Sequence, residues 1–203
     1  ITDQELKAVF HFLKNTIHYN ACRFMLYTGV RVGECCGLQW KDIDRKHGII
    51  HIRRTATRDL KPRNVLGDST KTKKSRRDIP MNKDVSAVIE EQWELYINTH
   101  DCISLCDYVF PGRSGTLANG SAIGQTLTQA EKKARAHGFN IPYFSVHAFR
   151  DTFASRAVRA GISPNTLKEL LGHSSLAMTM DLYAHVNQED KIEGMKKLQV
   201  MDF

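Results

Sequence analysis

Four side chains in the C-terminal part of the sequence have types and spacing suited to chemistry on a phosphate group. His147 and Arg150 lie three residues apart, so one helix can present an imidazole and a guanidinium on the same face. His173 follows at the end of a Leu-Gly-His turn, and Tyr183 lies ten residues beyond it. Arginine offers a planar fork that matches phosphate oxygens, histidine can donate a proton near neutral pH, and tyrosine can act as a covalent nucleophile. The set indicates phosphoryl transfer.

A fifth candidate, Arg31, lies early in the chain, just after a glycine turn. Gly29 allows the backbone to turn sharply, which would direct Arg31 from a junction between a loop and a helix. Glu34 follows three residues later. Taken alone, this pattern is that of a surface arginine near a helix start.

A basic segment separates two short predicted strands. We expect strands at residues 49–54 and 78–81, within a small three-stranded sheet, and a β-hairpin whose tip and flanks are residues 69–77. The positive residues of this segment are Lys71, Lys73, Lys74, Arg76 and Arg77. A run of charges of the same sign repels itself unless an anion neutralises it, and nucleic acid is the obvious anionic partner.

The composition is that of an ordinary soluble domain with a basic balance. The chain has 203 residues, which is enough for one well-packed domain. Its formal net charge of +7 and pI near 9.2 favour an anionic partner. The five cysteines form no Cys-x-x-Cys pair, and the adjacent Cys35 and Cys36 suggest core packing over a metal or disulfide site. We therefore expect a cytoplasmic protein with no metal and no membrane-spanning segment.

Hydrophobic spacing predicts mostly helices. Helices are expected at about residues 3–14, 19–27 and 121–137, and a long one after an Asn82 cap. Ser145 should cap the helix that carries His147, and Ser163 with Pro164 should open the next one. In the helix that carries Tyr183, Met178 is expected to face inward. The predicted fold is mainly α with a small antiparallel β-sheet.

Four motifs together resemble the tyrosine recombinase family, and most of all integrases of phages and conjugative transposons. They are TGVRVGE around Arg31, HAFRDTFA with His147 and Arg150, LGHSS around His173, and MTMDLYAHV around Tyr183. The resemblance covers residues 1–203 as a catalytic domain. The core-binding and arm-binding domains that such recombinases usually carry are absent from this chain, and its start at a helix suggests a piece of a longer protein.

The resemblance implies a role for each site residue. Tyr183 would attack a scissile DNA phosphate, forming a 3′-phosphotyrosyl bond and releasing a 5′-hydroxyl without cofactor or metal. Arg31 and Arg150 would hold the non-bridging oxygens, with Glu34 supporting Arg31. His147 and His173 would hydrogen-bond the phosphate or assist proton transfer. Lys71 would be the general acid, and the remaining basic residues of the hairpin would contact DNA: Lys73, Lys74, Arg76 and Arg77.

The implied partner is double-stranded DNA carrying recombination sites, bound by a homotetramer, with a directionality factor as a further partner. Similar recombinases dock a C-terminal helix onto a neighbouring subunit. Residues 187–203 are expected to dock in this way, although they could also pack within their own subunit.

Several alternatives stay open at this stage. Lys73 rivals Lys71 as general acid, Tyr143 rivals Tyr183 as nucleophile, and Asp151 stands where the family often has a histidine. A type IB topoisomerase shares the chemistry, and a non-catalytic DNA-binding module is the other main rival. A metallohydrolase that uses His147, His173 and His185 lacks a supporting HExxH motif or carboxylate cluster.

Overall fold

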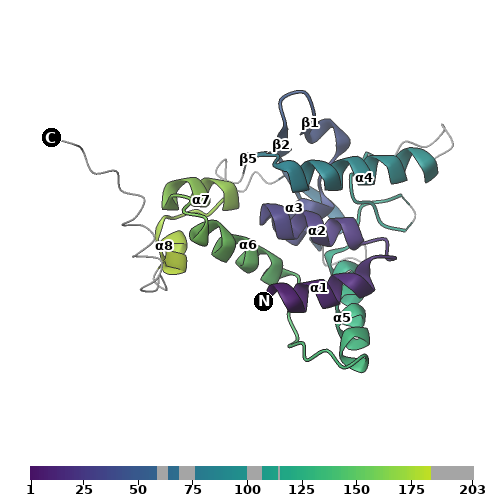
Figure 1. Ribbon diagram of the computed structural model, residues 1–203. Helices are drawn as coiled ribbons and strands as arrows, with labels where there is room; N and C mark the ends of the chain where they lie inside the picture. The colour runs from purple at the N-terminus through teal and green to yellow at the C-terminus, as the bar shows by residue number, and fades with distance from the viewer. Residues whose placement is uncertain (59–63, 69–75, 100–106, 114, 184–203) are drawn as a thin grey trace.

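A computed structural model describes residues 1–58, 64–68, 76–99, 107–113 and 115–183 of the chain. The described chain is mainly helical, with short antiparallel strands between α3 and α4 (Figure 1), as the sequence predicts. The helices are α1 (Asp3–Leu13), α2 (Tyr19–Thr28), α3 (Val32–Cys36), α4 (Lys83–Thr99), α5 (Gly120–Ala136), α6 (His147–Arg159), α7 (Pro164–Leu171) and α8 (Ala177–Tyr183). A 3₁₀ turn, η1 (Trp40–Asp42), precedes the first strand.

Local capping signals set several of the helix starts. Thr2 and Glu5 form the reciprocal capping box of α1, and the Asn82 side chain accepts a hydrogen bond from the Val85 amide at the start of α4. Ser163 caps α7 ahead of Pro164. The expected Ser145 cap on α6 is wrong, because Val146 is the N-cap residue and Ser145 accepts from the Ala148 amide through its backbone carbonyl.

The strands form two separate sheets, which differs from the single sheet predicted. The first has the order β1 (Ile43–Asp44), β2 (Ile49–Ile52), β5 (Arg77–Pro80), all antiparallel. The second is a hairpin of β3 (Arg54–Arg58) and β4 (Asn64–Asp68). The predicted strand at residues 49–54 therefore ends early, and its last residue begins β3. The predicted hairpin tip at residues 69–75 lies outside the described residues.

The alternation of side chains along the three-stranded sheet decides which residues reach the interior. Ile50 pairs with Ile79 across β2 and β5, and both are buried. Along β5 the pattern alternates, so Arg77 and Ile79 point inward while Asp78 and Pro80 are exposed. Arg77, the first residue of β5, thereby occupies a core-facing position.

Two hydrophobic clusters hold the described chain together. The larger joins α1, α2, α3, α4, α5 and the three-stranded sheet, and reaches the start of α6 at Phe149. The smaller lies between α6 and α7 and contains Ala154, Ala157, Leu167 and Leu171. In Figure 1, α6 runs from the helical body beside α1 to α7 and α8, so it spans both clusters. Its position sets where the C-terminal helices meet the rest of the chain.

Phe149 is the aromatic anchor of α6, and its replacement should be costly. It is fully buried, with its ring centroid 5.7 Å from that of Phe10 and 6.1 Å from that of Phe144. We expect Phe149→Ala to lower the free energy of unfolding by about 3–5 kcal/mol through lost burial and a residual cavity. The exposed Phe139 gives the control, and Phe139→Ala should change stability by no more than about 0.5 kcal/mol. Urea unfolding measures both, and equal losses would contradict this packing.

Candidate functional site: an arginine cluster at the end of helix α7

The last carbonyl groups of α7 lie where three distant parts of the chain meet. A helix end leaves its final carbonyls without partners inside the helix. Gly172 adopts the left-handed conformation (φ 67°), so its amide bonds the Lys168 and Glu169 carbonyls, and the His173 amide also bonds that of Lys168. The carbonyls of Leu170, Leu171 and Gly172 still need donors.

Three arginines supply those donors, one to each carbonyl. Arg77 Nε lies 2.7 Å from the Leu170 oxygen, Arg150 Nη2 lies 2.8 Å from the Leu171 oxygen, and Arg31 Nη2 lies 3.3 Å from the Gly172 oxygen. Their positive charges also suit the negative end of the helix dipole. The arginine cluster, defined as Arg31, Arg77 and Arg150, therefore completes the C-terminus of α7.

Arg150 is held from a second side by the turn that follows α2. Its Nη1 donates to the Gly29 carbonyl at 2.7 Å, and the residue is only 4% exposed. Gly29 has a φ of 66°, and a Cβ there would lie 2.4 Å from the Phe153 ring, so glycine is required at this crossing. Burial lowers the pKa of Arg150 to about 10, and the nearby Arg31 adds to this effect. The guanidinium still carries its charge at neutral pH.

Glu34 is the carboxylate that balances the cluster. It accepts from the Arg31 amide at 2.8 Å and from Arg31 Nη1 at 3.1 Å, and it receives a two-pronged hydrogen bond from Arg77 at 2.8 and 2.9 Å. Burial on its own would raise the pKa of Glu34, but Arg77 and then Arg31 lower it below its usual value. Three guanidinium groups face one carboxylate, so the cluster keeps net positive charge.

His173 lies directly after the α7 turn, beside the cluster. Its Nδ1 is 2.9 Å from the Thr179 hydroxyl oxygen, and Thr179 is fully buried in α8. Burial lowers the pKa of His173 to about 4, and the charges of Arg150, Arg31 and Arg77 contribute. The imidazole is thus neutral at pH 7. A hollow of about 460 Å³ opens next to it, lined in part by Arg76, Lys168 and Ser174. A positive cluster, a neutral histidine and an adjoining hollow together suit an anionic group.

The sequence profile of the Phage integrase family matches residues 1–190. The chain belongs to the phage integrase family. It is 30% identical over 185 residues to the integrase of Staphylococcus phage L54a, an alignment of 85% of this chain with 49% of that protein. It is 26% identical over 217 residues to a tyrosine recombinase XerC-like protein of Caldanaerobacter subterraneus, covering 97% of this chain and 53% of that protein.

Solved structures of the family have the same fold. The Tn1549 transposon integrase in complex with circular intermediate DNA matches 98% of this chain and 66% of that one, with a TM-score of 0.81 and 25% identity. The XerA recombinase superposes with a TM-score of 0.70 at 24% identity, covering 98% of this chain and 64% of that one. The expected family and fold are confirmed. The chain spans about half the length of the curated relatives it matches.

The structure brings some of the predicted site residues together and not others. Arg31, Glu34, Arg150 and His173 come together at the end of α7. His147 begins α6, with a side chain that is 65% exposed and an Nε2 3.8 Å from Asp151 Oδ1. The predicted residues Lys71, Lys73 and Lys74 lie outside the described part of the chain.

Tyr183 lies at the end of α8 and packs against the small α6–α7 cluster. Its hydroxyl donates to the Ile162 carbonyl in the loop between those helices. Burial raises the pKa of the phenol above its usual value, so the hydroxyl is protonated at neutral pH. The rival Tyr143 is 67% exposed and lies under the Arg135 guanidinium, 3.4 Å from ring centroid to Cζ. In α8 itself, Met178 is exposed, contrary to the prediction, and Thr179 takes the inward position.

Arg77 is placed differently from the predicted surface contact with DNA. It is buried, and its donors are directed to Glu34 and to the Leu170 carbonyl. Arg76, its neighbour, is exposed. The alternation along β5 was the available signal, because residues two apart in a strand lie on the same face, so Arg77 shares the face of the apolar Ile79. The run of positive residues that ends at Arg77 favours an exposed basic loop in the sequence, and it outweighs that alternation.

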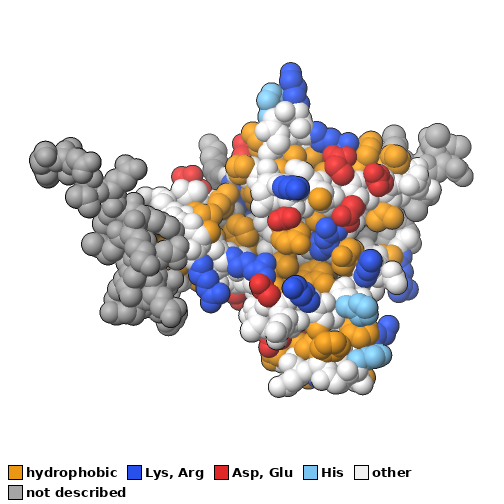
Figure 2. Space-filling model, viewed as in Figure 1, with side chains coloured by type: hydrophobic (Ala, Val, Ile, Leu, Met, Phe, Trp, Pro, Cys, Tyr) orange, Lys and Arg blue, Asp and Glu red, His pale blue; other side chains and the backbone are white. Residues whose placement is uncertain are grey.

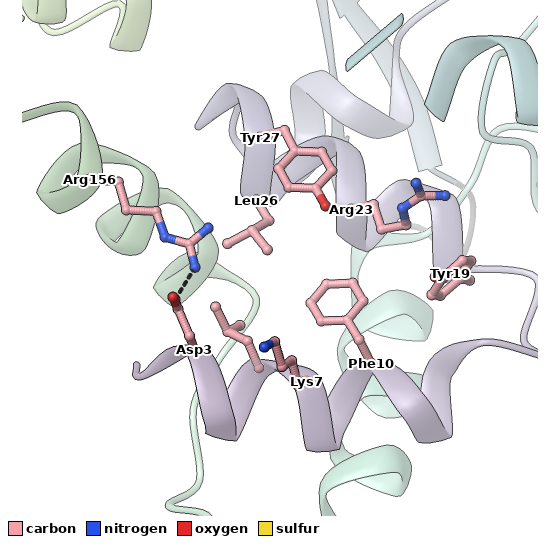
Figure 3. Close-up of a pocket in the computed structure, with 9 residues that line it drawn as sticks. Asp3, Lys7, Phe10, Tyr19, Arg23, Leu26, Tyr27 and Arg156 are labelled. Carbon is pink, nitrogen blue, oxygen red and sulfur yellow. Dashed lines mark hydrogen bonds and ion pairs between the residues drawn. The ribbon is translucent and has the colours of Figure 1, made fainter. Parts of the chain in front are cut away.

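A separate groove lies between α1, α2 and α6, away from the cluster (Figure 3). It has a volume of about 270 Å³, and Leu6, Phe10 and Leu26 contribute to its lining. Asp3 and Arg156 form an ion pair of 2.5 Å at its edge. The face shown in Figure 2 carries interspersed positive, negative and hydrophobic side chains. None of the predicted site residues lines this groove, so we assign the candidate site to the arginine cluster.

Among the residues that the structure describes, no group of three or more His, Cys, Asp or Glu side chains could hold a metal ion. The helices in this part of the chain include none with the length and hydrophobicity of a transmembrane segment.

Removal of the Glu34 charge should destabilise the fold strongly. Glu34→Gln leaves the buried Arg77 without its counter-ion, and we expect a loss of about 3–5 kcal/mol in the free energy of unfolding. The pKa of Glu34 is lower in the fold than in the unfolded chain, so its contribution to stability is present above the pKa of the unfolded chain and is lost as the pH falls through the pKa of the folded state. The difference between wild type and Glu34→Gln should therefore shrink in acid.

Glu91 provides the matched control for this prediction. It pairs with Arg23 at the surface, with a side chain that is 48% exposed. Glu91→Gln should cost no more than about 1 kcal/mol. Denaturant unfolding at pH 7 and at pH 4 compares the two variants, and a Glu34→Gln loss no larger than that of Glu91→Gln would contradict the buried pair.

Proposed function

We propose that the complete protein containing this chain is a site-specific DNA recombinase of the tyrosine class, which integrates or excises a mobile element. The supporting observation is the positive arginine cluster beside His173, within the fold of the phage integrase family. The names of its relatives, among them a phage integrase and transposon transposases, agree with this role. The substrate is double-stranded DNA, and the reaction is phosphoryl transfer with no cofactor.

Tyr183 is the proposed nucleophile. Its phenolic oxygen attacks the scissile phosphorus and loses its proton, a bond from that oxygen to phosphorus forms, and the bond from phosphorus to the 5′ oxygen breaks. The 3′ end stays attached to the tyrosine, and the 5′ oxygen takes a proton to leave as a hydroxyl. Because the energy of the broken bond is kept in the phosphotyrosyl link, a second 5′-hydroxyl can reverse the step and reseal the strand.

Arg31 and Arg150 are proposed to hold the non-bridging oxygens of that phosphate. Both already converge on the end of α7, and their charge would stabilise the extra negative charge of the transition state. His173, neutral and fixed by Thr179, can donate one hydrogen bond to the same group. His147, exposed on the first turn of α6, would approach from the solvent side.

The described position of Tyr183 requires one rearrangement before attack. Its hydroxyl is held by the Ile162 carbonyl, and no hydrogen bond or ion pair among the described residues joins it to the arginine cluster. We propose that DNA binding moves the end of α8 so that the phenol leaves Ile162 and reaches the phosphate. The phenol is protonated at neutral pH, so a base must accept its proton during the attack, and His147 or His173 is the proposed acceptor.

The basic residues before β5 are proposed to supply the general acid and further contacts with DNA. Lys71 is the proposed general acid for the 5′ oxygen, with Lys73 as its alternative. Lys74 and Arg76 are proposed to contact DNA phosphates.

A homotetramer on two recombination sites, with residues 187–203 docked onto a neighbouring subunit, would assemble the reacting strands. A directionality factor is the proposed further partner, and the core-binding and arm-binding domains would lie in the remainder of the protein.

The covalent intermediate gives a direct test of this function. The complete protein is incubated in EDTA with a duplex from the end of its own element, nicked so that the short fragment with the 5′-hydroxyl diffuses away. We expect a protein–DNA band that resists denaturant, because loss of the fragment prevents resealing. Tyr183→Phe should abolish the band, since phenylalanine has no nucleophilic oxygen, while the variant still binds the duplex.

Tyr143→Phe is the matched control, and it should leave the band unchanged. A band that survives Tyr183→Phe and disappears in Tyr143→Phe would move the nucleophile. Tight binding of DNA with no band in the wild-type protein would contradict the recombinase function and favour a binding role.

A further inference from the structure

We infer that Arg77 is a positioning residue, which fixes Arg31 and the end of α7 relative to each other by bridging Glu34 and the Leu170 carbonyl. The inference rests on the proposed function, because the geometry that Arg77 sets is that of the phosphate-holding groups. It replaces the expected role of Arg77 as a surface contact with DNA.

The contacts of Arg77 use its planar fork in two directions. Nη1 and Nη2 bond the two oxygens of Glu34 at 2.9 and 2.8 Å, and Nε bonds the Leu170 oxygen at 2.7 Å. The side chains of the Arg77–Glu34 pair are each 6% exposed. A guanidinium enclosed in this way cannot reach a DNA phosphate unless it breaks a buried ion pair. Its function must therefore act through its partners.

These bonds close a ring that includes the proposed phosphate-holding Arg31. Arg77 donates to the Leu170 carbonyl and to Glu34. Glu34 accepts from the amide and the side chain of Arg31. Arg31 in turn donates to the Gly172 carbonyl, which closes the ring. Leu170 and Gly172 belong to the same helix end. Movement of the Arg31 loop relative to α7 would thus break at least one bond of the ring, and His173 follows directly after it.

Gly172 shows how closely Arg77 packs against this helix end. A Cβ at position 172 would lie 2.9 Å from Arg77 Nη1, and the backbone there has a φ of 67°. Glycine is therefore needed both for the turn and for the approach of the guanidinium. The sequence alone suggests only the turn.

The fork shape distinguishes arginine from lysine at this position. Lysine has a compact charge on a flexible stem, and it can neutralise Glu34 or bond Leu170 but cannot reproduce the three-bond geometry. Arg77→Lys should therefore keep the charge balance and the fold while loosening the ring. A displacement of about 1 Å in phosphate-holding groups can slow a reaction by about 100-fold.

The test measures the rate of covalent complex formation on the nicked duplex at saturating DNA, together with DNA affinity and the unfolding transition. For Arg77→Lys in the complete protein we expect a cooperative unfolding transition, a Kd within about threefold of wild type, and a rate lower by about 10- to 100-fold. Arg156→Lys is the control, because Arg156 pairs with Asp3 at the surface away from the cluster. It should react at the wild-type rate.

A double variant tests whether Arg77 acts through Arg31. Residues that act as a unit show strongly non-additive effects. Adding Arg77→Lys to Arg31→Lys should slow the reaction by less than about threefold beyond Arg31→Lys alone. The full 10- to 100-fold loss in both backgrounds would overturn positioning through Arg31.

Arg77→Gln separates positioning from direct contact with DNA. Loss of one phosphate contact lowers the slope of log affinity against log salt concentration by about one. We expect that slope to stay at its wild-type value in Arg77→Gln. A reduced slope, or an Arg77→Lys rate equal to wild type while wild type forms the complex, would overturn the inference alone. Failure of the wild-type protein to form the complex would overturn the proposed function as well.

Discussion

The unpaired carbonyl groups at the end of α7 impose the constraint on which the rest of the site depends. Two carbonyls are bonded by the amides of the turn, but Leu170, Leu171 and Gly172 need donors from elsewhere. Arginines from the loop after α2, from β5 and from α6 provide them. A requirement of backbone hydrogen bonding thereby brings charged groups from three segments that are far apart in the sequence to one helix end.

The same arrangement creates a positive site at the cost of burying charge. Glu34 offsets part of that charge through Arg77 and Arg31, while Arg150 is bonded only to carbonyls in the hydrogen bonds described. Burial, together with the uncompensated charge of the arginines, lowers the pKa of His173 and keeps the imidazole neutral. A phosphate would supply the missing negative charge, so its binding would relieve repulsion that the fold otherwise tolerates. Arg31, which is half exposed, can exchange its carbonyl partner for such a ligand with least disturbance.

The sequence predicts the helices well because their starts carry local signals, such as the Thr2–Glu5 box and the Ser163–Pro164 pair. The motifs also predict the family. Placement of Arg77 could not be read from a one-signed run of charge, because its burial depends on pairing of β5 with β2 and on a carboxylate 43 residues away. Likewise, the bond from Tyr183 to Ile162 depends on how α8 packs against the α6–α7 loop, which spacing alone does not determine.

The most direct test of this account is a crystal structure of the complete Tyr183→Phe protein bound to its own recombination site. We expect the scissile phosphate to lie against Arg31, Arg150 and His173, with Arg31 turned from the Gly172 carbonyl to a phosphate oxygen. Arg77 should retain its bonds to Glu34 and to the Leu170 carbonyl, because they hold the frame on which the phosphate is placed. A structure in which Arg77 leaves Glu34 to contact DNA, or in which the phosphate lies away from the end of α7, would contradict the account.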